Sequence, residues 1–325
     1  MPSTTPAVRT TIETVLGPIA PSDLGFTLSH EHTPGVPAVL GVEYPWMYDM
    51  PAIRQRGIDE LTEAKQGGVD AIIDLSTPDL GRDMALSREY AERSGVHIVV
   101  ATGIWREVPR QLRAMTPERV AEIFIREITV GIQDTDIKAG VIKCASDTEG
   151  VSPAAEIILR AAAIASNETG CPISTHQWAP TQVGRQQVDI LKDAGADMNR
   201  VCIGHSADTT DVEYLHGLLE DGVWLSMDRY PGGVVIGADG EQRRPTWEER
   251  NATVRALIDR GWAGRLMLGH DYAPSLRPRD FPTRYLFLST VAIPGLLADG
   301  VPQATIDTMM REVPRAFLTG ARVEG

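Results

Sequence analysis

Six side chains of metal-binding type follow short apolar runs at widely separated points of the chain: His30, His32, Lys143, His176, His205 and Asp271. Imidazole and carboxylate groups bind divalent ions, whereas a lysine cannot do so while it is an ammonium. His30 and His32 are two residues apart, so in a strand they share one face, roughly 6 to 7 Å apart, and can reach one ion. Glu31 then points the other way, and we assign it a packing role or a supporting role behind the ligands rather than a ligand role.

Eight apolar runs, each followed by a stretch with helical periodicity, predict the elements that carry these groups. The predicted strands cover residues 25–29, 70–75, 97–102, 140–144, 172–176, 201–205, 223–227 and 265–270. Repeated strand-then-helix units predict a parallel sheet, and eight of them predict a (β/α)8 TIM barrel, with residues 1–325 as a single α/β domain. All six candidate ligands then lie at carboxyl ends of strands, where this fold places its active sites, and they predict a two-metal hydrolase site.

Local signals between the strands support the helices of this barrel. Thr116 and Ser152 are predicted N-caps, Gly170 is predicted to end the helix that Ser152 begins, and Thr246 with Glu249 has the form of a capping box. The stretch 230–245 is rich in glycine and charge, and we interpret it as the longest loop.

The composition excludes several classes of protein. A formal net charge of −13 and the absence of any Lys/Arg block argue against a nucleic-acid partner. The chain shows no signal-peptide pattern and no apolar run long enough to span a membrane, so we expect a soluble, cytoplasmic protein with no membrane partner. Three cysteines in or beside predicted strands are expected to be buried thiols, as in a reducing compartment.

The motifs around these residues resemble the phosphotriesterase family of the amidohydrolase superfamily, including its lactonase branch. The resemblance covers nearly the whole chain from about residue 14 to the last helix, and the motifs that carry it are Gly25–His32, Ala139–Lys143, Ile173–His176, Cys202–Asp208, Leu225–Tyr230 and Gly269–Tyr272.

The resemblance implies a centre with two divalent metal ions. His30, His32 and Asp271 would bind one ion, and His176 and His205 the other. Lys143 would bridge both as a carboxylated lysine, which offers one carbamate oxygen to each ion. Zinc suits these ligands, and so do iron, cobalt and manganese.

The resemblance also implies a mechanism in which a metal-bridging hydroxide attacks the substrate. Asp271 would orient the hydroxide, take its proton after the attack and pass it onward, while Arg229 and Asp208 would form an outward proton path or a substrate-positioning pair. We expect a small-molecule substrate in a pocket that is lined by Trp105, Arg229, Tyr230 and Tyr272.

Two residues give opposing signals about the substrate. Arg229 matches the lactonases, whereas organophosphate hydrolases of the family typically carry histidine there; Trp105 matches the organophosphate hydrolases, whereas lactonases usually carry tyrosine. We favour a lactonase that opens N-acyl homoserine lactones or related lactones, with a side activity on phosphotriesters. The alternatives are an organophosphate triester hydrolase or another carboxylic ester hydrolase, and, more remotely, a metal-binding barrel without turnover.

The remaining features have simpler interpretations. His97 and His216 are expected to be structural or solvated, and His270 is expected to turn away from the site and at most to support its ligands from behind. The family commonly forms homodimers, and the aromatic stretch 44–48 is a candidate contact surface.

Overall fold

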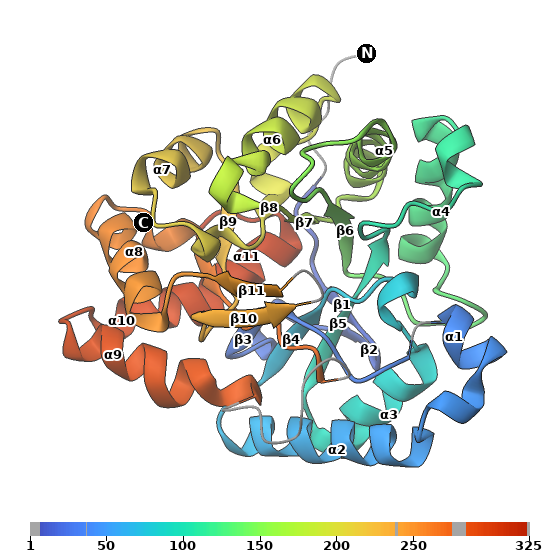
Figure 1. Cartoon of the computed structure of the whole chain (residues 1–325), viewed down its shortest axis with the longest axis horizontal. Coiled ribbons are helices and arrows are strands. Elements are labelled where there is room, and N and C mark those ends of the chain that lie inside the picture. The colour runs from blue at the N-terminus through green and yellow to red at the C-terminus, as the bar shows by residue number, and fades with distance from the viewer. Residues whose placement is uncertain (1–6, 37, 238–239, 275–283, 324–325) are drawn as a thin grey trace.

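The computed structural model describes residues 7–36, 38–237, 240–274 and 284–323. Eight parallel strands form one sheet in the order β12-β9-β8-β7-β6-β5-β4-β3. Their bounds are β3 (Thr27–Glu31), β4 (Ala71–Asp74), β5 (His97–Gly103), β6 (Val141–Ala145), β7 (Ile173–His176), β8 (Val201–Ile203), β9 (Trp224–Met227) and β12 (Leu266–Leu268). Helices surround these strands (Figure 1), and the predicted TIM barrel is confirmed.

The first and last strands close the barrel just beyond the end of β12. The backbone N–H of Asp271 donates to the carbonyl of His30 at 2.8 Å, and the N–H of His32 donates to the carbonyl of Tyr272 at 3.0 Å. Three predicted strand ends are wrong by two residues, because β3 continues to Glu31 while β8 stops at Ile203 and β12 at Leu268. His205, two residues beyond β8, and Asp271, three residues beyond β12, have positive φ angles of 54° and 51°, so the chain has left the extended conformation at both residues.

The helices follow the strands as predicted. Their bounds are α1 (Ala38–Glu43), α2 (Met50–Gln66), α3 (Met84–Ser94), α4 (Pro117–Thr129), α5 (Pro153–Thr169), α6 (Val183–Asp193), α7 (Val212–Glu220), α8 (Trp247–Asp259), α9 (Ile293–Ala298), α10 (Gln303–Asp307) and α11 (Val313–Thr319). Thr116 and Ser152 cap α4 and α5 through their side chains, Gly170 ends α5 with a left-handed backbone, and the capping box of Thr246 and Glu249 begins α8. None of the helices described is long and apolar enough to cross a membrane.

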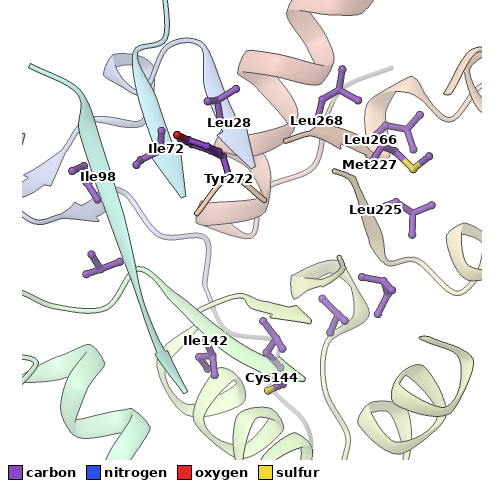
Figure 2. Close-up of a cluster of buried hydrophobic side chains, with 14 of the residues drawn as sticks. Leu28, Ile72, Ile98, Ile142, Cys144, Leu225, Met227, Leu266, Leu268 and Tyr272 are labelled. Atoms are coloured by element: carbon purple, nitrogen blue, oxygen red, sulfur yellow. The ribbon is translucent and has the colours of Figure 1, made fainter. Parts of the chain in front are cut away.

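The apolar core consists of two clusters, one inside the barrel and one between the strands and the surrounding helices. Val141, which shares a face of β6 with Lys143, belongs to the inner cluster, together with Ile12 and Phe317. Ile142 and Cys144 point the other way and belong to the outer cluster between strands and helices (Figure 2). The alternation along β6 therefore places the Lys143 side chain inside the barrel.

Two antiparallel hairpins extend this framework. β1 (Ile12–Thr14) pairs with β2 (Gly17–Ile19), and the backbone N–H of Val15 donates to the Ile98 carbonyl on β5. β10 (Val234–Gly237) pairs with β11 (Gly240–Arg243) inside the stretch 230–245, so the prediction of a loop there is wrong. The sequence did not predict this hairpin because glycine and charged residues have low strand propensity.

Candidate metal centre

The six predicted ligands come together at the carboxyl ends of the strands. Lys143 Nζ lies 3.1 Å from His30 Nε2, and His32 Nε2 lies 3.1 Å from Asp271 Oδ1. His205 Nε2 lies 2.8 Å from His176 Nδ1. One ligand atom from each of His30, His205 and Asp271 lies within 4.8 Å of the others, so ligands that are expected to bind different ions meet in one cluster.

A single buried carboxylate, Asp228, orients two of the imidazoles. Its Oδ2 is 2.9 Å from His30 Nδ1, and its Oδ1 is 2.7 Å from His205 Nδ1. It also accepts hydrogen bonds from the His205 backbone and from Ser226 Oγ. Because a carboxylate accepts the proton of each Nδ1, both Nε2 atoms keep the lone pairs that a metal ion needs. The sequence analysis assigned no role to Asp228; its place directly after β9, beside Arg229, was the available signal.

The other two imidazoles have their own partners. Asp147 Oδ2 lies 3.0 Å from His176 Nε2, which turns Nδ1 of His176 toward His205. Ser76 Oγ lies 2.9 Å from His32 Nδ1. Sequence reasoning missed both partners; Asp147 lies two residues after β6, so its position near the site was readable, but its contact with His176 was not.

Burial keeps the nitrogen ligands in the forms that bind metals. It lowers the pKa of His176 to about 4 and that of Lys143 to about 8, and it holds the pKa of His205 well below its ordinary value. At neutral pH these imidazoles are uncharged, and part of the Lys143 population is a free amine. Four imidazoles, an amine and a carboxylate form a donor set that fits two divalent ions.

Asp271 lies between these imidazoles and a fixed guanidinium. Its Oδ2 accepts a hydrogen bond from Arg229 Nε at 2.8 Å, and Arg229 Nη1 donates to Asp208 Oδ2 at 2.6 Å. Burial opposes the ionisation of Asp271, but His205 and Arg229 hold its pKa well below the usual range. Burial opposes the charge of Arg229 as well, yet Asp208 and Asp271 raise its pKa, so the guanidinium stays protonated.

Three of these functional positions have left-handed backbones although none is glycine. The φ angles are 54° at His205, 66° at Arg229 and 51° at Asp271. This region costs a side chain with a Cβ about 1 to 2 kcal/mol. The conformation turns each residue out of its strand and toward the shared centre.

The predicted pocket residues occupy different environments. Trp105 is half-buried, and its Nε1 donates to His176 Nδ1 at 3.4 Å. The Tyr230 ring is buried, and its hydroxyl donates to Asn251 Oδ1 at 2.9 Å. The Tyr272 hydroxyl lies 3.1 Å from Glu60 Oε2. Trp105 thus contacts the metal centre directly, whereas both tyrosine hydroxyls bond to residues outside it.

Glu31 and His270 form a pair behind the centre. Glu31 is fully buried, and its Oε1 lies 2.8 Å from His270 Nδ1 and accepts a hydrogen bond from the His270 backbone. Its Oε2 accepts a hydrogen bond from the backbone of Tyr272. The pair therefore links β3 to the segment after β12 and fixes the backbone on both sides of Asp271.

Comparisons with known proteins give one consistent result. The model of the phosphotriesterase family matches residues 10–318. A phosphotriesterase homology protein of Mycobacterium tuberculosis (strain H37Rv) is 36% identical over 322 residues, which cover 94% of this chain and 96% of the relative. An aryldialkylphosphatase of Saccharolobus solfataricus is 32% identical over 316 residues, covering 93% and 97%.

A solved structure agrees with these relatives. The phosphotriesterase from Mycobacterium tuberculosis superposes with a TM-score of 0.87 at 35% identity, covering 95% of this chain and 98% of that one. The sequence match and the shared fold both extend over almost the full length of the chain. The chain therefore belongs to the phosphotriesterase family, as the motifs at its strand ends predict.

Proposed function

We propose that this chain is a metal-dependent hydrolase that opens lactone rings, with N-acyl homoserine lactones as favoured substrates and phosphotriesters as side substrates. The observation that carries the proposal is the position of Asp271, whose two oxygens face His32 and Arg229 at 3.1 Å and 2.8 Å. A carboxylate in that position can receive a proton beside a metal centre while a cation holds its geometry.

In this proposal His30, His32 and Asp271 would hold one ion, and His176 and His205 would hold the other. Lys143, carboxylated by carbon dioxide, would serve as a ligand of both; its burial beside His30 supports this assignment because a buried amine is more readily neutral. Two bound ions supply a nucleophilic water near neutral pH and polarise the oxygen of the substrate carbonyl.

The protein residues divide the remaining work. Asp271 accepts the proton of the attacking water, and Arg229 keeps this carboxylate ionised and oriented. Because Arg229 stays protonated, it cannot pass a proton outward itself, and the pair with Asp208 acts as a positioning device. The Asp271 carboxyl then delivers the proton to the leaving oxygen or to solvent.

Turnover measurements test the substrate assignment. The metal-loaded protein should hydrolyse a series of homoserine lactones faster than an aryl dialkyl phosphate. A much higher kcat/KM for the phosphate would overturn the lactonase proposal and favour the alternative, an organophosphate triester hydrolase, which the contact of Trp105 with His176 supports. A metal count, combined with the intact mass of gently handled protein, tests for two ions and a carboxylated Lys143.

An oligomeric state and a compartment complete the proposal. Large apolar side chains are exposed on and after α1, with Val42 77% and Trp46 81% exposed, and this surface supports a homodimer. Light scattering should then give twice the chain mass, and Trp46→Ser should reduce it. Three free buried cysteines are consistent with the cytoplasm, where thiols stay reduced.

A further inference from the structure

Arg244 lies at the end of the second hairpin, next to the metal centre, and its charge is incompletely matched. Its backbone N–H donates to the Gly233 carbonyl at 2.8 Å, which fixes the residue at the base of the hairpin. Its side chain is only 18% exposed, and the carboxylate paired with it, Asp208, is 3.7 Å away. That distance is too long for a hydrogen bond. Its Nε is buried without a partner, and within the described residues the guanidinium makes no hydrogen bond.

Asp208 cannot satisfy Arg244 because two other arginines already bind it. Arg229 Nη1 donates to its Oδ2 at 2.6 Å, and Arg250 Nη2 donates to its Oδ1 at 2.8 Å. Arg229 also binds Asp271, and Arg250 Nη1 donates to the Asp228 carbonyl. The guanidiniums of Arg229, Arg244 and Arg250 thus share the carboxylates of Asp208 and Asp271. Because Arg229 and Arg250 make the hydrogen bonds to these carboxylates, Arg244 is the cation in excess.

The arrangement of these groups places the excess charge beside the reaction. From Arg244, ion pairs run through Asp208 and Arg229 to Asp271, the proposed proton acceptor. A mostly buried guanidinium with free donors in a fork geometry is suited to bind a carboxylate, phosphate or sulfonate with two parallel hydrogen bonds. An uncharged group would leave its charge unmatched.

We infer that Arg244 binds an anionic group of the substrate. This group lies on a part of the substrate that is distant from the bond that is cleaved. The inference rests on the proposed lactonase reaction, and for the substrate it ranks acidic lactones above the neutral N-acyl homoserine lactones that are favoured without this contact. Lactones with an acidic substituent become better substrates than neutral lactones of the same size. N-acyl homoserine lactones are uncharged and gain nothing from this contact.

A pair of lactones that differ in one charge tests the inference. The first is a γ-butyrolactone whose side chain ends in a carboxylate, and the second ends in the matching carboxamide. The wild type should favour the carboxylate, and Arg244→Met should lower kcat/KM for it roughly 10- to 100-fold, the range expected for a lost charge-assisted pair. The loss of kcat/KM for the carboxamide should be smaller, so the ratio of kcat/KM for the carboxylate to that for the carboxamide should fall in the variant.

Arg243 supplies a matched control on the same hairpin. Its side chain is 73% exposed and pairs with Glu249, so Arg243→Met removes an equal charge without touching the site. This variant should keep the preference for the carboxylate. Arg244→Lys keeps the charge but loses the two parallel donors, so it should retain part of the preference for the carboxylate. It also distinguishes loss of the contact from misfolding of the Arg244→Met variant. A wild type without preference, or equal loss on both lactones in Arg244→Met, would overturn the inference and leave Arg244 as a structural partner of Asp208.

A binding measurement separates this inference from the proposed reaction. Glutarate and its monoamide can each offer one carboxylate to the metals, and they differ only at the other end. Calorimetry on metal-loaded wild type should show tighter binding of glutarate, and Arg244→Met should bind the two equally. If no lactone is hydrolysed but this difference is found, the lactonase proposal fails and the anion site stands. Equal binding by the wild type, or no binding of either compound, removes the anion site.

Discussion

The Asp147 carboxylate determines which nitrogen of His176 can bind a metal ion. Its Oδ2 lies 3.0 Å from His176 Nε2 and 2.9 Å from Arg106 Nη1. The Arg106 guanidinium thus fixes the carboxylate, which accepts the proton of the imidazole. Asp147→Asn keeps the size of the side chain but allows an amide N–H to face Nε2. The imidazole would then carry its proton on Nδ1, the atom that faces His205 at 2.8 Å. A protonated Nδ1 cannot bind an ion.

The expected magnitude follows from this single contact. Loss of a partner that orients a metal-binding histidine typically lowers metal affinity by about 10- to 100-fold, or about 1.4 to 2.7 kcal/mol. Only the ion held by His176 and His205 should be affected, since the other ligands are oriented by Asp228 and Ser76. At limiting metal, the variant should therefore bind one ion where the wild type binds two.

Titration of the metal-free protein with cobalt, in competition with a chelator, measures both affinities. Glu149→Gln is the matched control, because Glu149 lies on the same loop, 3.9 Å from Arg106, with a 56% exposed side chain. It should leave both affinities unchanged. If Asp147→Asn binds two ions within threefold of the wild-type affinity, the tautomer argument is wrong.

Three further outcomes are expected. Asp271→Asn should lower kcat by a factor of about 10² to 10⁴ with little change in melting temperature, because an amide cannot accept the proton; near-normal turnover would remove Asp271 from the mechanism. The metal-free protein should lose stability as the pH falls from about 6.5 to about 4, and His176 should contribute up to about 3 kcal/mol of this loss, because burial lowers its pKa to about 4 and the unfolded chain binds the proton first. Denaturant unfolding at several pH values measures this slope, which His176→Gln should reduce but not remove, because burial lowers the pKa of His30 and His205 as well. Tyr230→Phe should destabilise the fold by about 1 to 3 kcal/mol, because Asn251 loses its donor, and leave KM unchanged; a raised KM would place Tyr230 in the substrate pocket.

The barrel was predictable because its strands are buried on both faces. Runs such as Val141–Ala145 are apolar or small apart from one functional residue, and each precedes a helix with clear capping signals. The hairpin of β10 and β11 lacks such a signal, since one of its strands is Gly-Glu-Gln-Arg. The left-handed backbones at His205 and Asp271, which follow β8 and β12, are not encoded by residue propensity.

The candidate ligands were predictable for a chemical reason. Few residue types bind metals, and their recurrence at strand ends limits where a centre can form. The groups that orient the ligands follow no such rule, because a carboxylate such as Asp147 after a strand is common and acquires its role only through its contact with His176. The role of Arg244 could not be predicted for the same reason, since this residue lies in a stretch that we interpreted as a loop.

The backbone at His205, Arg229 and Asp271 has a consequence for protein engineering. Glycine adopts such φ angles without penalty, but it would also remove the buried contacts of these side chains. At Arg229 it would leave the Asp208 and Asp271 carboxylates without their shared cation, at a cost of about 3 to 5 kcal/mol against about 1 to 2 kcal/mol of relieved strain. A mutant library screened for heat resistance should therefore exclude glycine at these three codons, as a library selected for turnover should.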